Sequence, residues 1–374
     1  MEKRIAIIGG GIVGATAAYY LSTLPGSEQT KVTLFDDGTG QATTAAAGII
    51  SPWLSKRRNQ RWYRLAKAGA DLFPELMHDA QLGTDVYQQT GTIVTREVPT
   101  DLETLFDLVQ ERRQDAATMG TVTTLNAAEV QAKVPLLSRA QPGVFITGGA
   151  RVDGAALVSG LLAKATQKNL TIRRERVSLD AQGQVLTSLG ARQFDRVIIA
   201  AGAWLKELVA PLGITAAVRP QKGQLIELAV KDYPLNENMP VVMPEGERDF
   251  VPFGHGKLIV GATHEDDGKF NLAADPAVTA DLLASAQRLM ADVTADNITG
   301  VRVGTRAYTA DFAPFFGPIP DQEKFLVASG LGSSGLTTGP QVGRLLAGSA
   351  LYGGMPDWSE YELPLTTYLT SSAE

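Results

Sequence analysis

The stretch Lys3-Arg4-Ile5-Ala6-Ile7-Ile8-Gly9-Gly10-Gly11-Ile12-Val13-Gly14-Ala15 determines how the rest of the chain is organised. Its apolar part, from Ile5 to Gly9, predicts a short strand that is buried on both faces. The spacing Gly9-x-Gly11-x-x-Gly14 follows, and the residues after it predict a helix. Strand, glycine turn and helix in this order form the context that a dinucleotide-binding fingerprint requires.

The three fingerprint glycines have separate physical roles. Gly9 permits the tight turn, Gly11 lets the backbone approach a pyrophosphate, and Gly14 lets the helix pack closely on the strand. The start of the helix presents free N–H groups to the phosphates. A second predicted strand, residues 31–35, ends in Asp36, close to the spacing of about 20 residues expected for the acid that holds a ribose hydroxyl. These features alone leave NAD and FAD as open alternatives.

The composition excludes several classes of site. The chain has 374 residues, a net charge of −6 and no cysteine, so disulfides, thiolate metal sites, a cysteine nucleophile and a cysteine-linked flavin are excluded. The acidic balance gives no general attraction to nucleic acid. With three histidines we expect no histidine metal site, and without a run of about 18 apolar residues we expect no membrane span. The apolar N-terminus lacks a clear cleavage site, so we do not interpret it as a signal peptide.

One sheet is predicted to be interrupted by an insertion. Residues 194–204 form a buried apolar strand that ends in small residues, as a central parallel strand does. The simplest organisation is a single dinucleotide-binding sheet broken by residues near 86–145. From Arg219 onward the pattern changes to strands of an antiparallel sheet, which include residues 223–228, 250–252 and 257–263.

Two other segments stand out. Residues 324–340 repeat the order of strand, glycine-rich turn and helix near the end of the chain. Residues 56–64 hold five basic side chains beside aromatic ones, which is compatible with nucleic acid or a membrane surface. We interpret this short cluster as the solvated start of a helix, because the whole chain is acidic.

At this point the chain resembles the D-amino-acid oxidase superfamily of FAD-dependent amine oxidoreductases, which includes glycine oxidase, sarcosine oxidase and D-amino-acid dehydrogenase. The resemblance covers nearly the full length. It depends on motifs in a fixed order: the N-terminal fingerprint with Asp36, Thr44-Ala45-Ala46-Ala47-Gly48-Ile49, Val152-Asp153-Gly154, Ala200-Ala201-Gly202-Ala203-Trp204, Lys222-Gly223-Gln224, Val260-Gly261-Ala262-Thr263, Arg306 to Pro314 and Gly332-Ser333-Ser334-Gly335.

The resemblance implies an α/β and α+β fold, with a Rossmann-like FAD-binding domain of the glutathione-reductase type and an inserted antiparallel substrate domain. The FAD-binding domain would comprise residues 1–85, 146–219 and 317–374, and the substrate domain residues 86–145 and 220–316. The FAD would be noncovalent, since no histidine lies near the first flavin stretch. The implied cofactor contacts are Gly9, Gly11, Ile12, Val13, Gly14, Asp36, Asp37, Thr44, Ala45, Ala46, Ala47, Gly48, Ile49, Val177, Ala201, Gly202, Trp204, Gly332, Ser333, Ser334, Gly335, Leu336 and Thr337.

The implied chemistry needs few side chains. A neutral amine passes its Cα hydrogen as hydride to flavin N5, and the start of the last helix stabilises the negative charge that reduction places near N1 and O2. An arginine should orient the substrate by holding its carboxylate with two parallel hydrogen bonds. We choose Arg306, because Arg306-x-x-Thr309-x-Asp311-x-x-Pro314 resembles the family's RPxTPDxxP element. Arg302 is the alternative, and one of the two arginines is expected to be a structural ion-pair partner.

The sequence departs from the family pattern around the substrate. Phe250 stands where D-amino-acid and glycine oxidases have a tyrosine, so their substrate preference is in doubt. Tyr308 is then the candidate hydroxyl, or else a packed aromatic, and His264 either reaches the site or lies at the surface.

These features together predict a cytoplasmic oxidoreductase, peripheral at the inner membrane face if a quinone is its acceptor. Its substrate would be glycine, a D-amino acid or an N-methyl amino acid, with O₂ or a quinone as electron acceptor and neither a nucleic-acid partner nor a membrane span. The product imino acid would hydrolyse to a 2-oxo acid. The alternatives are a tRNA-modifying or other amine oxidoreductase, a flavin-binding protein without turnover, and an NAD-dependent dehydrogenase.

Overall fold

The computed structural model describes residues 2–55, 59–230, 238–246, 248–353, 358–361 and 364–371. Lys56, Arg57 and Arg58 of the predicted basic cluster lie outside the described residues. The rest of that cluster leads into a helix that begins at Gln60. No helix in the described ranges is long and apolar enough to cross a membrane.

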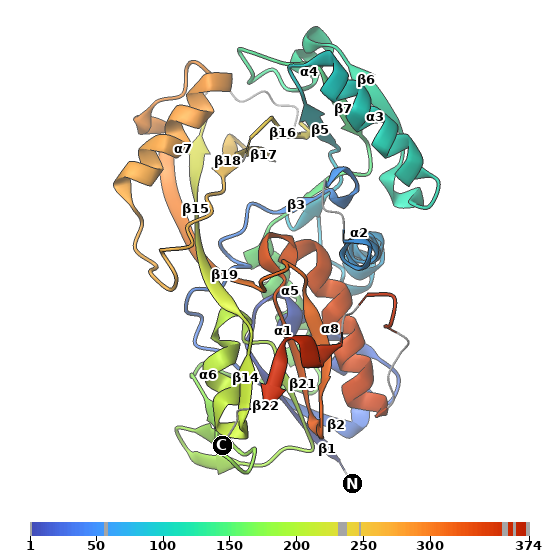
Figure 1. Ribbon diagram of the computed structural model, residues 1–374, viewed down its shortest axis with the longest axis vertical. Coiled ribbons are helices and arrows are strands. Elements are labelled where there is room, and N and C mark those ends of the chain that lie inside the picture. Colours follow the sequence, from blue (N-terminus) through green and yellow to red (C-terminus); the bar gives the residue numbers. More distant parts are fainter. Residues whose placement is uncertain are drawn as a thin grey trace.

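A six-stranded sheet holds the N-terminal strand at its centre (Figure 1). β1 pairs in parallel with β2 on one side and with β13 on the other, and only β20 runs antiparallel to its neighbour. The predicted parallel sheet, interrupted between its second and later strands, is therefore present. Its strands, in spatial order, are β20 (Phe315–Ile319), β21 (Gln322–Ser329), β13 (Arg196–Ile199), β1 (Lys3–Ile8), β2 (Thr30–Phe35) and β9 (Leu170–Arg173).

Helices pack closely together beside this sheet. α1 (Ile12–Thr23) contacts both α5 (Gly154–Thr166) and α8 (Gly335–Tyr352), and α8 also contacts α2 (Gln60–Ala80). The crossing of α1 and α8 depends on glycine, because a Cβ at Gly343 would lie 2.6 Å from the carbonyl oxygen of Val13. This close packing brings the N-termini of α1 and α8 to the same region of the molecule.

An eight-stranded mixed sheet forms the other part of the molecule, above the first sheet in Figure 1. Its two long strands, β15 and β19, run from the lower part of the molecule into the upper part. Helices α3 (Pro99–Arg113), α4 (Ala127–Lys133) and α7 (Pro276–Leu289) accompany this sheet. Its strands, in spatial order, are β19 (Ile298–Tyr308), β15 (Arg219–Ala229), β18 (Lys257–Gly261), β17 (Asp249–Gly254), β16 (Val241–Met243), β5 (Thr92–Thr95), β7 (Gly143–Ile146) and β6 (Val122–Leu125).

The two faces of the eight-stranded sheet are both apolar but meet different partners. Phe250 and Val260 point into a cluster that includes α7 residues such as Leu282. Val251 and Ile259 point the other way, towards Ala47 and Ile49 of the small-residue stretch. Because side chains alternate along a strand, each residue of β17 belongs to one of these two faces.

The remaining elements are short. They are β3 (Ile49–Ile50), β4 (Tyr87–Gln88), β8 (Ala150–Val152), β10 (Ser178–Leu179), β11 (Val185–Thr187), β12 (Gly190–Arg192), β14 (Ile214–Ala216), β22 (Leu369–Ser371) and α6 (Leu205–Val209).

Two helix boundaries differ from the sequence-based expectation. The helix expected over 282–290 begins earlier, at Pro276, because the side chain of Asp275 accepts the N–H of Ala277 and caps it. The helix expected over 101–119 ends at Arg113, and a separate 3₁₀ turn follows at Ala117–Met119.

Candidate active site

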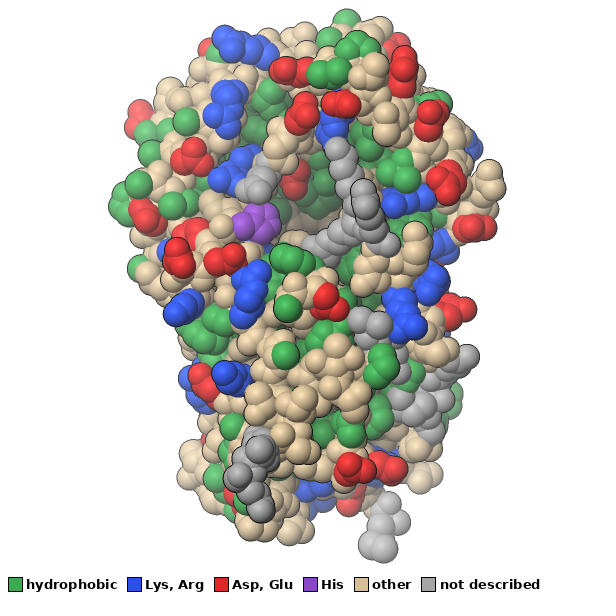
Figure 2. Space-filling view, in the orientation of Figure 1, with side chains coloured by type: hydrophobic (Ala, Val, Ile, Leu, Met, Phe, Trp, Pro, Cys, Tyr) green, Lys and Arg blue, Asp and Glu red, His purple; other side chains and the backbone are tan. Residues whose placement is uncertain are grey.

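Two adjoining hollows, each of about 490 Å³, form one elongated cavity between the two sheets. We call one the fingerprint hollow, lined among others by Gly9, Asp36 and Trp204, and the other the arginine hollow, lined among others by Ala47 and Arg306. The hollows share four lining residues, Ala42, Thr43, Gly332 and Gly335. Figure 2 shows that this face of the molecule is hollowed in its upper half.

The glycine turn forms one wall of the fingerprint hollow. Gly9 has φ +107°, and a Cβ there would lie 2.3 Å from the carbonyl oxygen of Ala200, so a side chain is excluded. A Cβ at Gly14 would lie 1.9 Å from the carbonyl oxygen of Gly9, so Gly14 serves the packing of helix on turn and is not among the residues that line the cavity. The hydroxyl of Thr43 accepts the N–H of Ile12 at 3.0 Å and fixes the start of α1.

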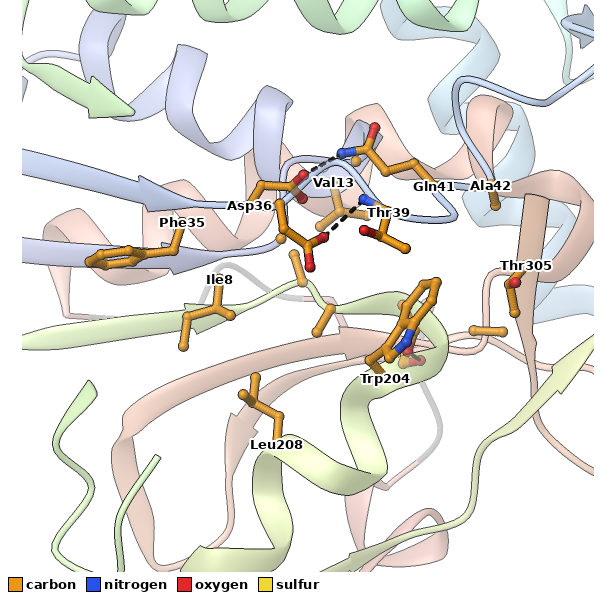
Figure 3. Close-up of a pocket in the computed structure, with 18 of the residues that line it drawn as sticks. Ile8, Val13, Phe35, Asp36, Thr39, Gln41, Ala42, Trp204, Leu208 and Thr305 are labelled. Carbon is orange, nitrogen blue, oxygen red and sulfur yellow. Dashed lines mark hydrogen bonds between the residues drawn. The ribbon is translucent and has the colours of Figure 1, made fainter. Parts of the chain in front are cut away.

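Asp36 lies at the wall of the fingerprint hollow with both carboxylate oxygens engaged (Figure 3). One oxygen accepts the N–H of Gly10, and the other accepts the N–H of Gly38 at 2.6 Å and the Gln41 amide at 2.7 Å. Asp37 accepts the N–H of Thr39 at 2.9 Å. The turn after β2 therefore holds an acidic pair at the edge of the cavity.

The far rim of the fingerprint hollow contains an ion pair and an indole. Arg176 Nε lies 3.3 Å from Asp37 Oδ2, and its guanidinium lies 6.0 Å from the centre of the Trp204 ring. Val177, Ala201 and Gly202 also line this hollow.

The small-residue stretch lines the arginine hollow from Ala45 to Ile49. Gly48 has φ +87°, and a Cβ there would lie 2.0 Å from the carbonyl oxygen of Val152. Thr44 is not among the described residues that line either hollow, and its carbonyl oxygen faces Arg302 at 3.5 Å.

The second glycine turn joins the two hollows. Gly332–Ser334 form a 3₁₀ turn, and α8 begins at Gly335 without a side-chain cap. Ser333, Ser334, Leu336 and Thr337 line the arginine hollow. The first N–H groups of α8 therefore lie at the cavity wall, where the helix dipole favours negative charge.

Tyr308 lies beneath this turn and is not among the described residues lining the cavity. Its hydroxyl accepts the N–H of Ser333 at 3.1 Å, and its ring packs edge-on against Phe312. A Cβ at Gly332 would lie 2.2 Å from the Tyr308 ring. Of the two possibilities for Tyr308, the packed aromatic is the one that the structure contains.

Arg306 points into the arginine hollow and is held there by neutral groups. Nη1 donates to the carbonyl oxygen of Thr263 at 2.7 Å and to Oε1 of Gln221 at 3.2 Å. Burial lowers the pKa of this guanidinium from its usual value, against the raising effect of Tyr308 and Glu265. Within the described ranges no carboxylate forms an ion pair with Arg306, so it can receive an anionic ligand.

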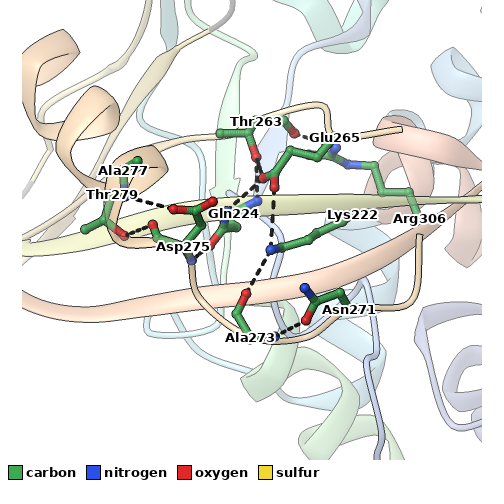
Figure 4. A network of polar contacts seen from close by, with 10 residues as sticks. All are labelled: Lys222, Gln224, Thr263, Glu265, Asn271, Ala273, Asp275, Ala277, Thr279 and Arg306. Atoms are coloured by element: carbon green, nitrogen blue, oxygen red, sulfur yellow. Dashed lines mark hydrogen bonds and ion pairs between the residues drawn. The ribbon is translucent and has the colours of Figure 1, made fainter. Parts of the chain in front are cut away.

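A polar network supports the strand end that Arg306 contacts (Figure 4). Lys222, 3% exposed, donates to the carbonyl oxygen of Ala273 at 2.8 Å, and its ammonium lies 3.5 Å from Glu265. The Gln224 amide donates to Glu265 at 2.9 Å and accepts the N–H of Asp275 at 2.8 Å. These contacts fix the segment Thr263–Glu265 and thereby the position of Arg306.

Arg302 has a different environment, although it lies on the same strand. Its Nε and Nη2 both donate to Oε1 of Glu227. Burial raises the pKa of Glu227, but the hydrogen bonds and charges of Arg302 and Lys257 outweigh it and hold this pKa below its usual value. Arg302 is thus the structural ion-pair partner of the two arginines.

Phe250 does not lie over the cavity, contrary to the sequence-based expectation. It is 3% exposed and packs in the apolar cluster on the opposite face of the sheet. Its neighbour Asp249 lines the arginine hollow instead. Successive residues of a strand point to opposite faces, so Phe250 packs away from the hollow while Asp249 faces it.

His264 is exposed and lines the arginine hollow. Arg96, which directly follows β5, is half-buried and lines the same hollow. Sequence reasoning did not single out Arg96 or Asp249. Strand alternation around Phe250 is the signal that points to Asp249. Nothing local identifies Arg96, because it reaches the cavity through the pairing of β5 with β16.

Comparisons with known proteins agree on one family. Residues 4–349 match the model of the DAO family, described as FAD dependent oxidoreductase. The chain is 37% identical over 358 residues to the uncharacterized oxidoreductase YurR of Bacillus subtilis, covering 92% of this chain and 94% of that one. It is 27% identical over 357 residues to a glycine oxidase of Pseudomonas putida, covering 91% and 92%.

Solved structures have the same fold. The iminodiacetate oxidase IdaA of Chelativorans sp. BNC1 superposes with a TM-score of 0.88 at 34% identity, covering 98% of each chain. The glycine oxidase of Geobacillus kaustophilus superposes with a TM-score of 0.82 at 24% identity, covering 96% of this chain and 98% of that one. The fold class predicted from the sequence is confirmed.

Proposed function

Since the chain belongs to the DAO family of FAD-dependent oxidoreductases, we propose that it oxidises the amine of a small amino acid. The substrate class is glycine, a D-amino acid or an N-methyl amino acid, and the product imino acid hydrolyses to a 2-oxo acid. One observation carries this proposal: the half-buried guanidinium of Arg306 faces the cavity and has neutral partners.

FAD is the cofactor of the family, and the elongated cavity fits it. The glycine turn and the start of α1 would meet the pyrophosphate, with Asp36 at the adenosine ribose and Val177 near the adenine. Ala45 to Ile49 would lie against the flavin ring, since their small side chains leave room for a flat group. When bound, FAD supplies an acceptor for the hydride of the substrate's Cα–H bond.

Arg306 would bind the substrate carboxylate through two parallel hydrogen bonds. Such a pair fixes the direction of the Cα–H bond, and orientation supplies a large part of the rate. The network around Lys222 and Glu265 keeps the guanidinium in place before the substrate arrives. The uncapped start of α8 places N–H groups at the wall shared by both hollows, where they stabilise developing negative charge.

We infer that the two sheets belong to two domains with different binding roles. Residues 1–85, 146–219 and 317–374 would hold FAD, and residues 86–145 and 220–316 would select the substrate. This division is supported by strand pairing. The strands β5, β6 and β7 from residues 86–145 lie in the same eight-stranded sheet as the strands β15, β16, β17, β18 and β19 from residues 220–316.

A second candidate substrate is an N-carboxymethyl amino acid, which carries two carboxylates. Arg96 gives the arginine hollow a second guanidinium on the strand β5 side, and its Nη1 donates to the neutral carbonyl oxygen of Thr95 at 2.6 Å. The 34% identity to an iminodiacetate oxidase over 98% of each chain supports this candidate.

The test is anaerobic reduction of the purified flavoprotein by single amines. Glycine, sarcosine, iminodiacetate, proline and a set of D-amino acids are each mixed with the enzyme, and the loss of flavin absorbance is followed. Reduction by at least one of them, with a 2-oxo acid as product, is expected. Absence of reduction by all of them would favour a flavin-binding protein without turnover or a different amine substrate, such as a modified tRNA base.

The electron acceptor is tested by mixing the reduced enzyme with O₂ or with a soluble quinone. We propose one of these two as the acceptor. Stoichiometric peroxide identifies an oxidase, whereas rapid reoxidation by the quinone alone identifies a dehydrogenase.

A further inference from the structure

Asp249 is the acidic group at the substrate end of the cavity. It is the first residue of β17, paired with Gly261 of β18, and it lines the arginine hollow together with Arg306 and His264. Val251, two residues along, lies on the same face and packs towards the small-residue stretch. Strand alternation therefore aims the Asp249 carboxyl at the space between that stretch and Arg306.

The carboxyl of Asp249 has no assigned structural role. In the described part of the chain it accepts no hydrogen bond and forms no ion pair, whereas Asp36, Glu227 and Glu265 are all engaged. Asp249 is half-buried, and a carboxyl that lines a cavity without a protein partner is a candidate for a ligand-binding or catalytic group. Desolvation raises the pKa of Asp249 to about 7, which is suitable for exchanging a proton near neutral pH.

Three other segments contribute basic side chains to the hollow that Asp249 lines. Arg306 on β19, Arg96 after β5 and His264 after β18 line the same hollow. Arg248, which directly precedes Asp249 in the chain, donates to the carbonyl oxygen of Ala262 and to Asp281. Asp249 and Arg306 line the same hollow and give it a carboxyl and a guanidinium, the complement of an amino acid's ammonium and carboxylate.

An amino acid at neutral pH carries its nitrogen as an ammonium group. In that form no lone pair is available on nitrogen to form the C=N bond as hydride leaves Cα. A group in the cavity that removes one proton from nitrogen therefore makes the abundant form of the substrate reactive.

We propose that Asp249 is the proton acceptor for the substrate ammonium group. This assignment rests on the proposed function. In the step, one N–H bond of the ammonium breaks, its electron pair stays on nitrogen as the lone pair, and the proton forms an O–H bond with a carboxylate oxygen of Asp249. Asp249 returns the proton to water after the imino product leaves.

The experiment measures kcat/KM for substrate oxidation and the anaerobic rate of flavin reduction in the holoenzyme, each as a function of pH. The wild type is compared with Asp249→Asn and with Asp267→Asn, which removes an exposed carboxylate from a nearby loop. For the wild type and for Asp267→Asn, kcat/KM should rise with pH and level off above pH ~7. For Asp249→Asn the rate at pH 7 should fall about 100-fold, and the loss should shrink as pH rises towards the pKa of the free amine.

A second readout does not depend on turnover. Infrared difference spectra of the holoenzyme between pH 5 and pH 9 should contain one carboxyl signal that Asp249→Asn removes and Asp267→Asn retains. The flavin content and the thermal unfolding curve of each variant check that it is folded.

Each other outcome overturns the assignment. If Asp249→Asn keeps the wild-type pH profile, Asp249 is not the acceptor, while amine oxidation itself stands. If KM alone rises and the profile is unshifted, the carboxylate holds the ammonium as a fixed anion. If no amine reduces the wild type, the proposed function fails and the assignment fails with it.

Discussion

The hydroxyl oxygen of Tyr308 lies 3.1 Å from the backbone nitrogen of Ser333 and accepts its N–H. This bond joins the end of β19, which carries Arg306, to the glycine turn that precedes α8. The group expected to hold substrate and the turn expected to meet the flavin are therefore fixed to each other.

Tyr308→Phe should loosen that turn by removing the hydrogen bond. It should leave no cavity, because the ring still packs against Phe312. One hydrogen bond contributes about 0.5–1.5 kcal/mol, so the dissociation constant for FAD should rise by about 2- to 12-fold. Equilibrium titration of the apoprotein with FAD measures this effect. An unchanged constant would show that the bond does not position the turn.

Arg306→Ala and Arg302→Ala should have separable effects. A hydrogen bond to a charged group contributes about 1.5–3 kcal/mol, so Arg306→Ala should raise the substrate KM by about 10- to 150-fold and keep FAD bound. Arg302→Ala leaves Lys257, at 3.2 Å, as the one cation paired with Glu227 among the described residues, and should lower the melting temperature with little effect on KM. Steady-state kinetics and thermal unfolding of both variants measure these effects. A raised KM for Arg302→Ala with an unchanged KM for Arg306→Ala would refute the assignment.

Gly223→Ala tests the position of Arg306 without removing it. A Cβ at Gly223 would lie 2.8 Å from the guanidinium, so Arg306 must shift, and KM should rise while FAD stays bound. Gly348→Ala on α8 is the matched control, since nothing outside its chain neighbours and its own helix backbone lies within 4 Å of the added Cβ. Equal KM values for the two variants would show that the guanidinium position is unimportant.

The geometry of the glycine turn could be predicted from the sequence, because strand, turn and helix are consecutive there, and Gly9 and Gly14 lie where the turn and the helix packing exclude a side chain. The lining of the arginine hollow could not be predicted in the same way. Phe250 was named from the sequence, but its neighbour Asp249 lines the hollow, since local sequence does not reveal which face of β17 is inside. Arg96 depends on a pairing between strands about 150 residues apart in the chain.

Asp249 should also make stability depend on pH. Its folded pKa is raised from 3.8 to about 7, so the folded state binds more protons than the unfolded state between these values. Stability therefore falls as pH rises from about 4 to about 7, by at most about 4 kcal/mol and less to the extent that cavity water reaches the carboxyl. Asp249→Asn should raise the melting temperature more at pH 8 than at pH 5, and an equal shift at both would contradict the raised pKa.

The most direct test of amine oxidation is anaerobic titration of the holoenzyme with glycine, sarcosine, iminodiacetate and D-amino acids, read as flavin absorbance near ~450 nm. At least one amino acid should bleach this band completely in the wild type, and Arg306→Ala should need about 10- to 150-fold more of it. A band that persists with every amine, in a protein that holds FAD, would contradict amino-acid oxidation at this site.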